Sequence, residues 1–181
     1  GKDNIPFHCL FWPAQLMGAG DGLHLPDDVP ANQYVTFKGG KASASRGVGL
    51  TIREGLDLFQ ADGLRYALAA NFPEQADTDI SIEEIARRIN EELVATWGNL
   101  VNRVLSMVHK NLGAHPGPDG RTAEDEAVLA AVDDALVTAG DHIERVELRN
   151  ALRAAMDGAQ SINVYLLSLI HISEPTRHVD I

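Results

Sequence analysis

The chain has 181 residues, with 26 acidic and 15 basic side chains and a formal net charge of −11. This acidic balance alone argues against nucleic-acid binding, which depends on Lys and Arg facing phosphates, although a basic face can exist on an acidic protein. No apolar run is long enough to span a bilayer, and the single cysteine, Cys9, excludes an internal disulfide and a cysteine-cluster zinc site. We therefore expect a cytoplasmic protein that makes no membrane contact and holds no metal within this chain.

Residues 1–60 carry most of the Gly and Pro turn signals and have an α/β-like organisation, with strands feeding glycine-rich loops. The β-branched and aromatic run at 34–37 predicts a short strand. It leads into a cationic loop at 38–47, which consists mainly of small residues. Another short apolar run follows at 48–52.

From residue 61 onward the pattern is helical. A short helix at 63–71 ends at Phe72-Pro73, and the polar connector 77–79 follows. Ser81 and Glu84 form a capping box that opens a long helix, in which apolar residues recur at helical spacing for about eight turns. Thr122 to Asp125 opens a second helix by the same pattern, and residues 147–166 form a third. Together they predict a helical bundle.

The last fifteen residues, 167–181, do not fit this bundle. Their β-branched residues and proline predict an interruption of the third helix, and the string matches the translation of an adapter used in transposon-based sequencing libraries. A genuine strand after the bundle is the alternative. We interpret 167–181 as a non-native tail and exclude it from fold and function.

The first candidate site is the N-terminal run from Gly1 to His8, which continues to Trp12-Pro13-Ala14. A glycine lets a backbone approach a ligand closely, and the neighbouring Asp3 carboxylate accepts hydrogen bonds from sugar hydroxyls. Phe7 and His8 combine an aromatic wall with a polar ring, which suits an apolar ligand with one polar group. From composition alone, a turn followed by core aromatics is the stronger reading.

The second candidate is the cationic loop. Its small residues allow a backbone to wrap phosphates, the hydroxyls of Ser43 and Ser45 can donate hydrogen bonds, and Lys41 and Arg46 supply charge. The spacing of a P-loop is absent. A solvated hairpin tip is an equally good interpretation.

The third candidate is a polar stripe on the long helix. At 100° per residue, the apolar face centres on Leu93, Trp97 and Val104. Asn99 and Arg103 lie together on the opposite face, where they could bind bases through bidentate hydrogen bonds. An ordinary solvated helix face is the simpler alternative.

The order and spacing of these elements resemble the methionyl-tRNA synthetases, a family of class I aminoacyl-tRNA synthetases. Gly1-Lys2-Asp3 with Phe7-His8 and Trp12-Pro13-Ala14 resembles a strand-to-helix segment of that family, and 41–47 occupies the place of its KMSKS motif. The resemblance covers residues 1 to about 166 and includes these further segments: Leu64-Arg65-Tyr66, Asp77-Thr78-Asp79, Asn90-Glu91-Glu92-Leu93 and Trp97-Gly98-Asn99-Leu100-Val101-Asn102-Arg103.

The resemblance implies a fold that is α/β plus all-α. Residues 1–60 would be the C-terminal part of a Rossmann-type catalytic domain with the KMSKS-like loop, and 61–80 a stem-contact connector. Residues 81–166 would be a truncated anticodon-binding helical bundle. The implied reaction is ATP-dependent ligation of methionine to its tRNA through methionyl-adenylate, with Mg²⁺ accompanying ATP and tRNA(Met) as partner.

The resemblance also implies residue roles. Phe7 and His8 would line the methionine pocket, while Gly1 and Asp3 would contact the adenosine of ATP. Asn99 and Arg103 would read the anticodon. In the loop, Lys41, Ser43, Ser45 and Arg46 would hold the triphosphate, with Ala44 also at the ATP.

Ala44 replaces the second lysine of KMSKS, a loss that, uncompensated, would slow the reaction by about 10²–10³. Lys41 and Arg46, with Lys38, are the candidates for compensation. The family's HIGH motif, and a connective domain that often holds zinc, would precede Gly1. We therefore expect the chain alone to be inactive.

Three other interpretations remain. Another class I synthetase, for an aliphatic amino acid or cysteine, would share the fold and loop. A non-catalytic tRNA-binding module agrees with Ala44. An acidic helical interaction protein explains only residues 81–166.

Overall fold

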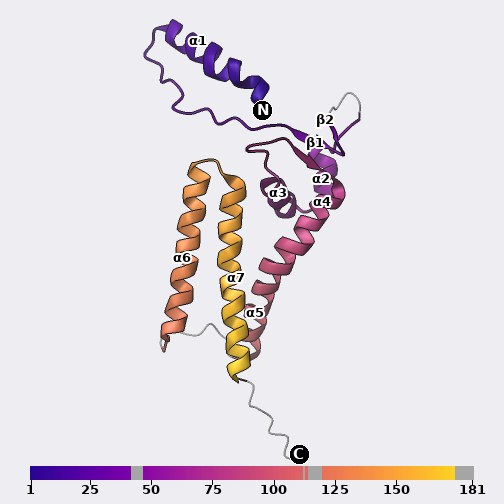
Figure 1. The fold of residues 1–181 in the computed structure, drawn as a ribbon, viewed down its shortest axis with the longest axis vertical. Coiled ribbons are helices and arrows are strands. Elements are labelled where there is room, and N and C mark those ends of the chain that lie inside the picture. Colours follow the sequence, from indigo (N-terminus) through magenta and orange to yellow (C-terminus); the bar gives the residue numbers. More distant parts are fainter. Residues whose placement is uncertain (42–46, 112, 114–119, 174–181) are drawn as a thin grey trace, which may run out of the picture. The chain divides into compact units, whose positions relative to one another are not determined.

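The computed structural model describes residues 1–41, 47–111, 113 and 120–173 of the chain (Figure 1). The chain divides into two compact units, Gly1–Ile85 and Ala86–Ile181. The loop residues 42–46, which include the predicted Ser43, Ala44, Ser45 and Arg46, lie outside the described residues.

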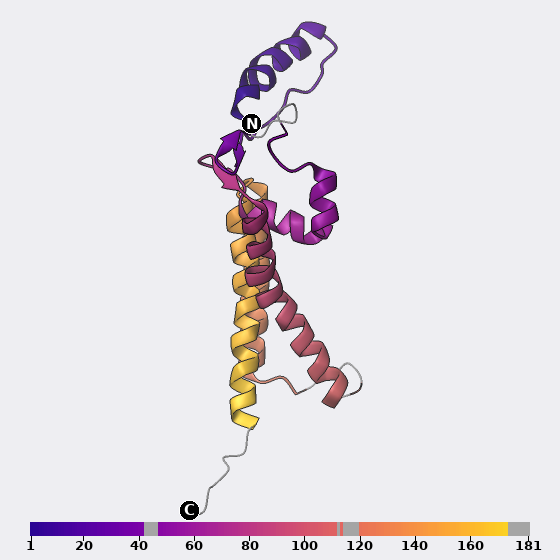
Figure 2. The ribbon, with the colours of Figure 1, turned by 90° about the vertical axis from the view of Figure 1, so that its right-hand side faces the viewer.

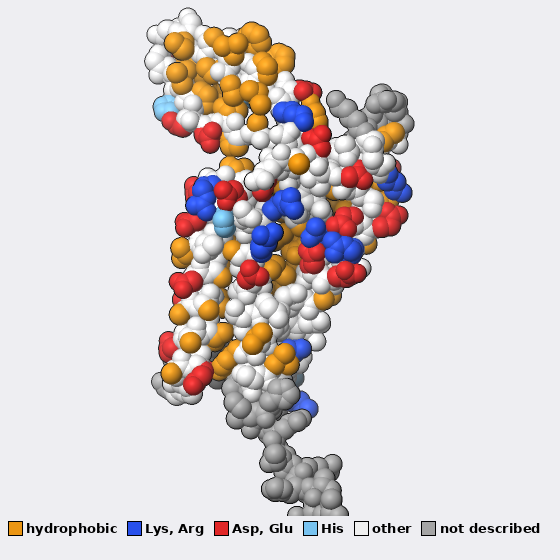
Figure 3. Space-filling model, viewed as in Figure 1, with side chains coloured by type: hydrophobic (Ala, Val, Ile, Leu, Met, Phe, Trp, Pro, Cys, Tyr) orange, Lys and Arg blue, Asp and Glu red, His pale blue; other side chains and the backbone are white. Residues whose placement is uncertain are grey.

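The first unit begins with a helical segment made of η1 (Lys2–Asn4), the π-helical η2 (Phe7–Phe11) and α1 (Trp12–Ala19). Gly20, with φ of 73°, ends α1 in the left-handed conformation that glycine adopts without steric cost. None of these elements has a buried residue, and hydrophobic side chains cover much of this segment in Figure 3. The aromatic residues here are therefore not core residues of this chain.

A small sheet follows, with β1 (Val35–Phe37) between β2 (Gly40–Lys41) and β3 (Thr78–Ile80). The predicted strand at 34–37 is confirmed as β1. β1 and β2 are antiparallel and joined by the two-residue turn Lys38-Gly39, in which both φ angles are positive, 50° and 74°. Positive φ at both positions is the geometry that favours a tight hairpin. β3 pairs in parallel with β1, with Val35 opposite Thr78.

Two helices, α2 (Ile52–Leu58) and α3 (Ala61–Ala70), lie in the chain between β1 and β3 and provide the long connection that a parallel pair requires. A complete capping box, Thr51 with Glu54, starts α2. Gly55 allows close packing, since a Cβ built there would lie 3.2 Å from the Leu64 side chain. The apolar run at 48–52 therefore leads into a helix.

The long helix is confirmed as α4 (Ile82–Arg87), the π-helical η4 (Arg88–Gly98) and α5 (Asn99–Asn111), which follow one another without interruption (Figure 2). The Ser81 hydroxyl accepts a hydrogen bond from the Glu84 amide at 3.1 Å, as the capping pattern predicts. The eleven-residue π-helical stretch is a departure from the regular α-helix that the sequence spacing indicates.

The second unit also holds α6 (Ala123–Glu144) and α7 (Leu148–Ser173), an antiparallel pair (Figure 1). The Thr122–Asp125 capping box starts α6, as predicted. The Tyr165 hydroxyl of α7 donates a hydrogen bond to Asp125, so the beginning of α6 is tied to the far part of α7. A further bond, from the Asn163 amide to the Thr96 carbonyl at 3.4 Å, ties α7 to η4.

The predicted interruption of the third helix at residue 167 is wrong, because α7 continues to Ser173. β-branched residues lower helix propensity by well under 1 kcal/mol each, which an established helix can absorb.

The turn between α6 and α7 carries a residue in an unfavourable conformation. Val146 has φ of 58°, and the amides of Val146 and Glu147 bond to the carbonyls of Ile143 and His142, both at 2.8 Å. This is a Schellman motif, whose left-handed position normally holds glycine.

We expect Val146→Gly to stabilise the second unit by about 1 kcal/mol, because a β-branched residue is strained at positive φ. Urea unfolding followed by circular dichroism measures the change. Val146→Ala is the control, since it removes the side chain but keeps the strain, and should gain little. A lower unfolding midpoint for Val146→Gly would contradict the assignment of strain.

Candidate active site

A cavity of about 190 Å³ lies beside the N-terminal helical segment and is lined by Gly1, Asn4, Ile5, His8, Val29, Pro30 and Ala31. His8 Nδ1 is 2.9 Å from the Asn4 carbonyl oxygen. Because a carbonyl oxygen only accepts, this contact places a proton on Nδ1 and leaves Nε2 as the ring atom open to a ligand. The cavity therefore brings together two predicted site residues, Gly1 and His8, for which the family resemblance implies contacts with ATP and methionine.

Phe7 does not line that cavity. Its ring packs against Phe11, with 5.7 Å between the ring centroids, and its side chain is 59% exposed. The two neighbours Phe7 and His8 therefore lie on different surfaces of the N-terminal helical segment.

Asp3 is linked to the sheet through Tyr34. A hydrogen bond with the Asp3 carboxylate, followed by burial and the nearby charges of Asp3 and Asp77, raises the pKa of Tyr34 above its usual value. The Lys2 ammonium lies 4.6 Å from the centre of the Tyr34 ring, a cation–π contact. The start of the chain is thus held against the residue that precedes β1.

Lys41 is the second residue of β2 and pairs in register with Thr36 of β1. The rest of the predicted phosphate-binding set, residues 43–46, lies outside the described residues and stays a prediction. Lys38, one candidate for compensating charge, has its ammonium 3.9 Å from a Glu83 carboxylate oxygen, and its side chain is largely exposed.

Asn99 and Arg103 occupy the first turns of α5 in the second unit. Asn99 is exposed, and its side-chain amide donates to the Ala95 carbonyl at 2.9 Å. Arg103 is half-buried. The Asn99 side-chain oxygen and the Arg103 guanidinium are groups of the kind that bind base edges.

The predicted apolar face of the long helix is partly wrong. Leu93 and Val104 are half-buried as expected, and Leu100, which the regular spacing places on the same face, is only 3% exposed. Trp97, by contrast, is 49% exposed, and it lies in the π-helical η4.

Asp77 and Asp79 belong to the segment 77–79, which was predicted to be a polar connector. Their carboxylates make long-range contacts. Asp77 Oδ1 accepts from the Tyr34 amide at 3.0 Å, and Asp79 Oδ1 accepts from the Gly39 amide at 2.7 Å. The available signal was their spacing, because residues two apart on a strand point to the same side.

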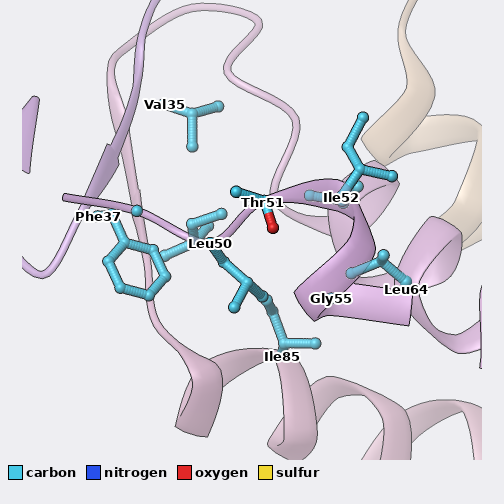
Figure 4. Close-up of a pocket in the computed structure, with 11 residues that line it drawn as sticks. Val35, Phe37, Leu50, Thr51, Ile52, Gly55, Leu64 and Ile85 are labelled. Carbon is cyan, nitrogen blue, oxygen red and sulfur yellow. The ribbon is translucent and has the colours of Figure 1, made fainter. Parts of the chain in front are cut away.

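A second cavity, of about 230 Å³, lies within the first unit (Figure 4). Its labelled side chains come from β1, the segment before α2, both following helices and Ile85, and Thr51 is the one polar residue among them. With no titratable group in its lining, this cavity holds no residue for chemistry.

No group of three potential metal ligands occurs among the residues that the structure describes. Within the same residues, no helix combines the length and apolar character needed to cross a membrane.

Comparison with known proteins gives a consistent family. The sequence model for "tRNA synthetases class I (M)" matches residues 1–105. The methionine–tRNA ligase of Roseiflexus sp. is 48% identical over 166 residues, which cover 92% of this chain and 28% of the relative. That of Chloroflexus aurantiacus is 42% identical over 181 residues and covers 92% of this chain and 30% of the relative. The chain thus spans less than a third of these relatives.

Solved structures agree. Mycobacterium tuberculosis methionyl-tRNA synthetase in complex with methionyl-adenylate superposes with a TM-score of 0.81 at 34% identity, over 93% of this chain and 33% of that one. Its apo form gives 0.78 at 31% identity, over 97% and 34%. A class I tRNA synthetase fold, mostly helical with a small sheet that includes a parallel pair, is therefore present. On sequence and structure alike, this chain belongs to the methionyl (M) family of class I tRNA synthetases.

Proposed function

We propose that this chain serves as part of a methionine–tRNA ligase, which activates methionine with ATP and transfers it to tRNA(Met). The observation that carries the proposal is the 48% identity to a ligase of that name over 166 residues. The likeness to a synthetase solved with methionyl-adenylate supports the same two substrates, methionine and ATP.

In the proposed first step, a methionine carboxylate oxygen forms a bond to the α-phosphorus of ATP while the bond to the β-phosphate oxygen breaks. Pyrophosphate leaves and methionyl-adenylate remains. Gly1 and His8, which share the 190 Å³ cavity, would hold the reactants, with His8 Nε2 as a polar contact. Asp3 would accept from the adenosine, and Phe7 would contact the methionine side chain. Catalysis on this scheme depends mainly on positioning and charge stabilisation.

The triphosphate would be held by Lys41, Ser43, Ser45 and Arg46, with the Ala44 backbone alongside. Mg²⁺ would arrive bound to the ATP phosphates, so it would need few ligands from the protein. In the second step, a hydroxyl at the tRNA 3′ end attacks the adenylate carbonyl and AMP leaves. Asn99 and Arg103 would bind the anticodon, so that residues 81–166 act as the anticodon-binding bundle. We place this activity in the cytoplasm.

The test uses a chimera, because the chain spans 28% of the Roseiflexus relative. Residues 1–166 replace the matching segment of that ligase, and methionine-dependent ATP–pyrophosphate exchange and charging of purified tRNAs are measured. Exchange and charging with methionine alone support the proposal. Activity with another aliphatic amino acid would indicate a different class I synthetase, and tRNA binding without exchange would indicate a non-catalytic module.

In the active chimera, we expect Lys41→Ala to lower ATP–pyrophosphate exchange at least about tenfold, or about 1.4 kcal/mol of transition-state free energy. The reason is that Lys41 supplies positive charge at the proposed triphosphate site, where Ala44 supplies none. Lys110→Ala, which removes a charge from the end of α5, should leave exchange unchanged. Equal exchange rates in both variants would rule out a phosphate role for Lys41.

A further inference from the structure

Two aspartates beside β3 each contact a different segment of the proposed ATP site. Asp77 immediately precedes the strand and Asp79 is its central residue. Because they are two residues apart, their side chains lie on the same side of the chain. Asp77 contacts Lys2 of the N-terminal segment and the amide of Tyr34, which precedes β1, whereas the partners of Asp79 are in the hairpin that leads to Lys41.

Asp77 holds the segment that contains Asp3. Its Oδ1 accepts from the Lys2 ammonium at 3.2 Å and from the Tyr34 amide at 3.0 Å. Lys2 also donates to Gln33 Oε1 at 2.8 Å. Lys2 is therefore restrained by a carboxylate, an amide oxygen and, through the cation–π contact, the Tyr34 ring. The neighbouring Asp3 is fixed with it.

Asp79 closes the turn before Lys41. Its Oδ1 accepts from the Thr36 hydroxyl at 2.6 Å and from the Gly39 amide at 2.7 Å. Gly39 is the second residue of the positive-φ turn, and the preceding amide, of Lys38, donates to the Ile80 carbonyl at 3.2 Å. The turn is thus bonded to β3 at two successive amides, and Lys41 follows two residues after Gly39.

These contacts are better suited to positioning than to stability. All four Oδ1 contacts of the two aspartates are at exposed positions, where ion pairs and hydrogen bonds contribute little to unfolding free energy. The donors lower the pKa of both carboxyl groups below their usual value, so both are charged at neutral pH. By contrast, displacing a substrate-binding group by about 1 Å can cost about 10²-fold in rate.

We propose that Asp77 and Asp79 are positioning residues for adenylate formation. From β3 and the residue before it, they fix two segments of the proposed ATP site, Lys2-Asp3 and the hairpin that leads to Lys41. The inference rests on the proposed function. It links the motif Asp77-Thr78-Asp79 to the ATP site through the residues that the two aspartates contact. Neither aspartate touches the reacting atoms.

The experiment compares aspartate variants in the active chimera. Asp79→Ala and Asp77→Ala should each lower kcat for ATP–pyrophosphate exchange by about 10- to 100-fold. The KM for methionine should change little. Asp79→Asn should restore much of the rate, because an amide oxygen still accepts from Gly39, whereas Asp77→Asn should restore less, because the charge that holds Lys2 is lost. Asp57→Ala, in the exposed part of α2, is the matched control and should retain the wild-type rate.

Hydrogen exchange separates positioning from general unfolding. Asp79→Ala should speed exchange at the Gly39 amide and Asp77→Ala at the Tyr34 amide, with each variant leaving the other amide and the melting temperature nearly unchanged. Wild-type rates in the alanine variants would overturn this inference while the proposed function stands. A loss of rate that follows a loss of folded protein would overturn it as well. An inactive wild-type chimera would overturn the proposed function, and this inference with it.

Discussion

Replacing Gly158 with valine is expected to destabilise the α6–α7 pair by about 1–3 kcal/mol, towards the upper end of that range. Gly158 is buried in α7, and a Cβ built there lies 2.9 Å from the Cβ of Ala135 in α6. Neither atom can rotate away, since both are fixed to helix backbone. Accommodating valine therefore requires the two helices to separate, which also pulls apart the neighbouring buried alanines, Ala139, Ala151 and Ala159.

Helix propensity acts in the opposite direction and needs its own control. Valine is favoured over glycine within a helix by a few tenths of a kcal/mol. Gly140→Val provides this gain alone, because Gly140 is an exposed residue of α6 and a Cβ there meets nothing within 4 Å. Urea unfolding of both variants should therefore give midpoints that move in opposite directions. Similar midpoints would show that the helices do not approach closely at Gly158.

A double-mutant cycle can assign the effect to one contact. Ala135→Gly removes the opposing Cβ, so Gly158→Ala should be tolerated better in that background than in the wild type. If the two substitutions were additive, the destabilisation would have to arise elsewhere in α7.

Local signals in the sequence identified where helices begin. The pairs Ser81–Glu84 and Thr122–Asp125 were predicted as caps; Thr122–Asp125 makes both bonds of a capping box, and the Ser81 hydroxyl accepts from the Glu84 amide. Thr51 and Glu54 have the same spacing and also make both bonds. They were not predicted as a cap, because Thr51 lies within the apolar run at 48–52. Capping depends on residues three apart, so it can be recognised without knowledge of the fold.

The candidate site depended more on non-local geometry. Gly1 and His8 were predicted to belong to the same N-terminal site, but the other side of the cavity that they share comes from Val29 to Ala31, a segment with no functional signal of its own. The bond between Thr36 and Asp79 joins residues 43 apart in the chain. It depends on the parallel register of β1 and β3, and a slip of one residue would move Asp79 to the other side of the strand.

The exposure of Trp97 could not be derived from spacing, because no residue pattern indicates the π-helical stretch in η4 that contains it. A wheel at 100° per residue places Trp97 and Leu100 on the same face, whereas the structure buries Leu100 and leaves Trp97 half exposed.

The burial of Leu100 leads to the other large expected effect. Leu100→Ala should destabilise the second unit by about 2–5 kcal/mol, because Leu100 is 3% exposed and its removal leaves a cavity. Leu105→Ala is the matched control on α5, where the side chain is 63% exposed and alanine is the better helix former. It should be neutral or slightly stabilising in urea unfolding. Trp97→Ala should cost less than Leu100→Ala, because the Trp97 side chain is 49% exposed. A larger loss of stability for Trp97→Ala would contradict the burial that the structure gives these two residues.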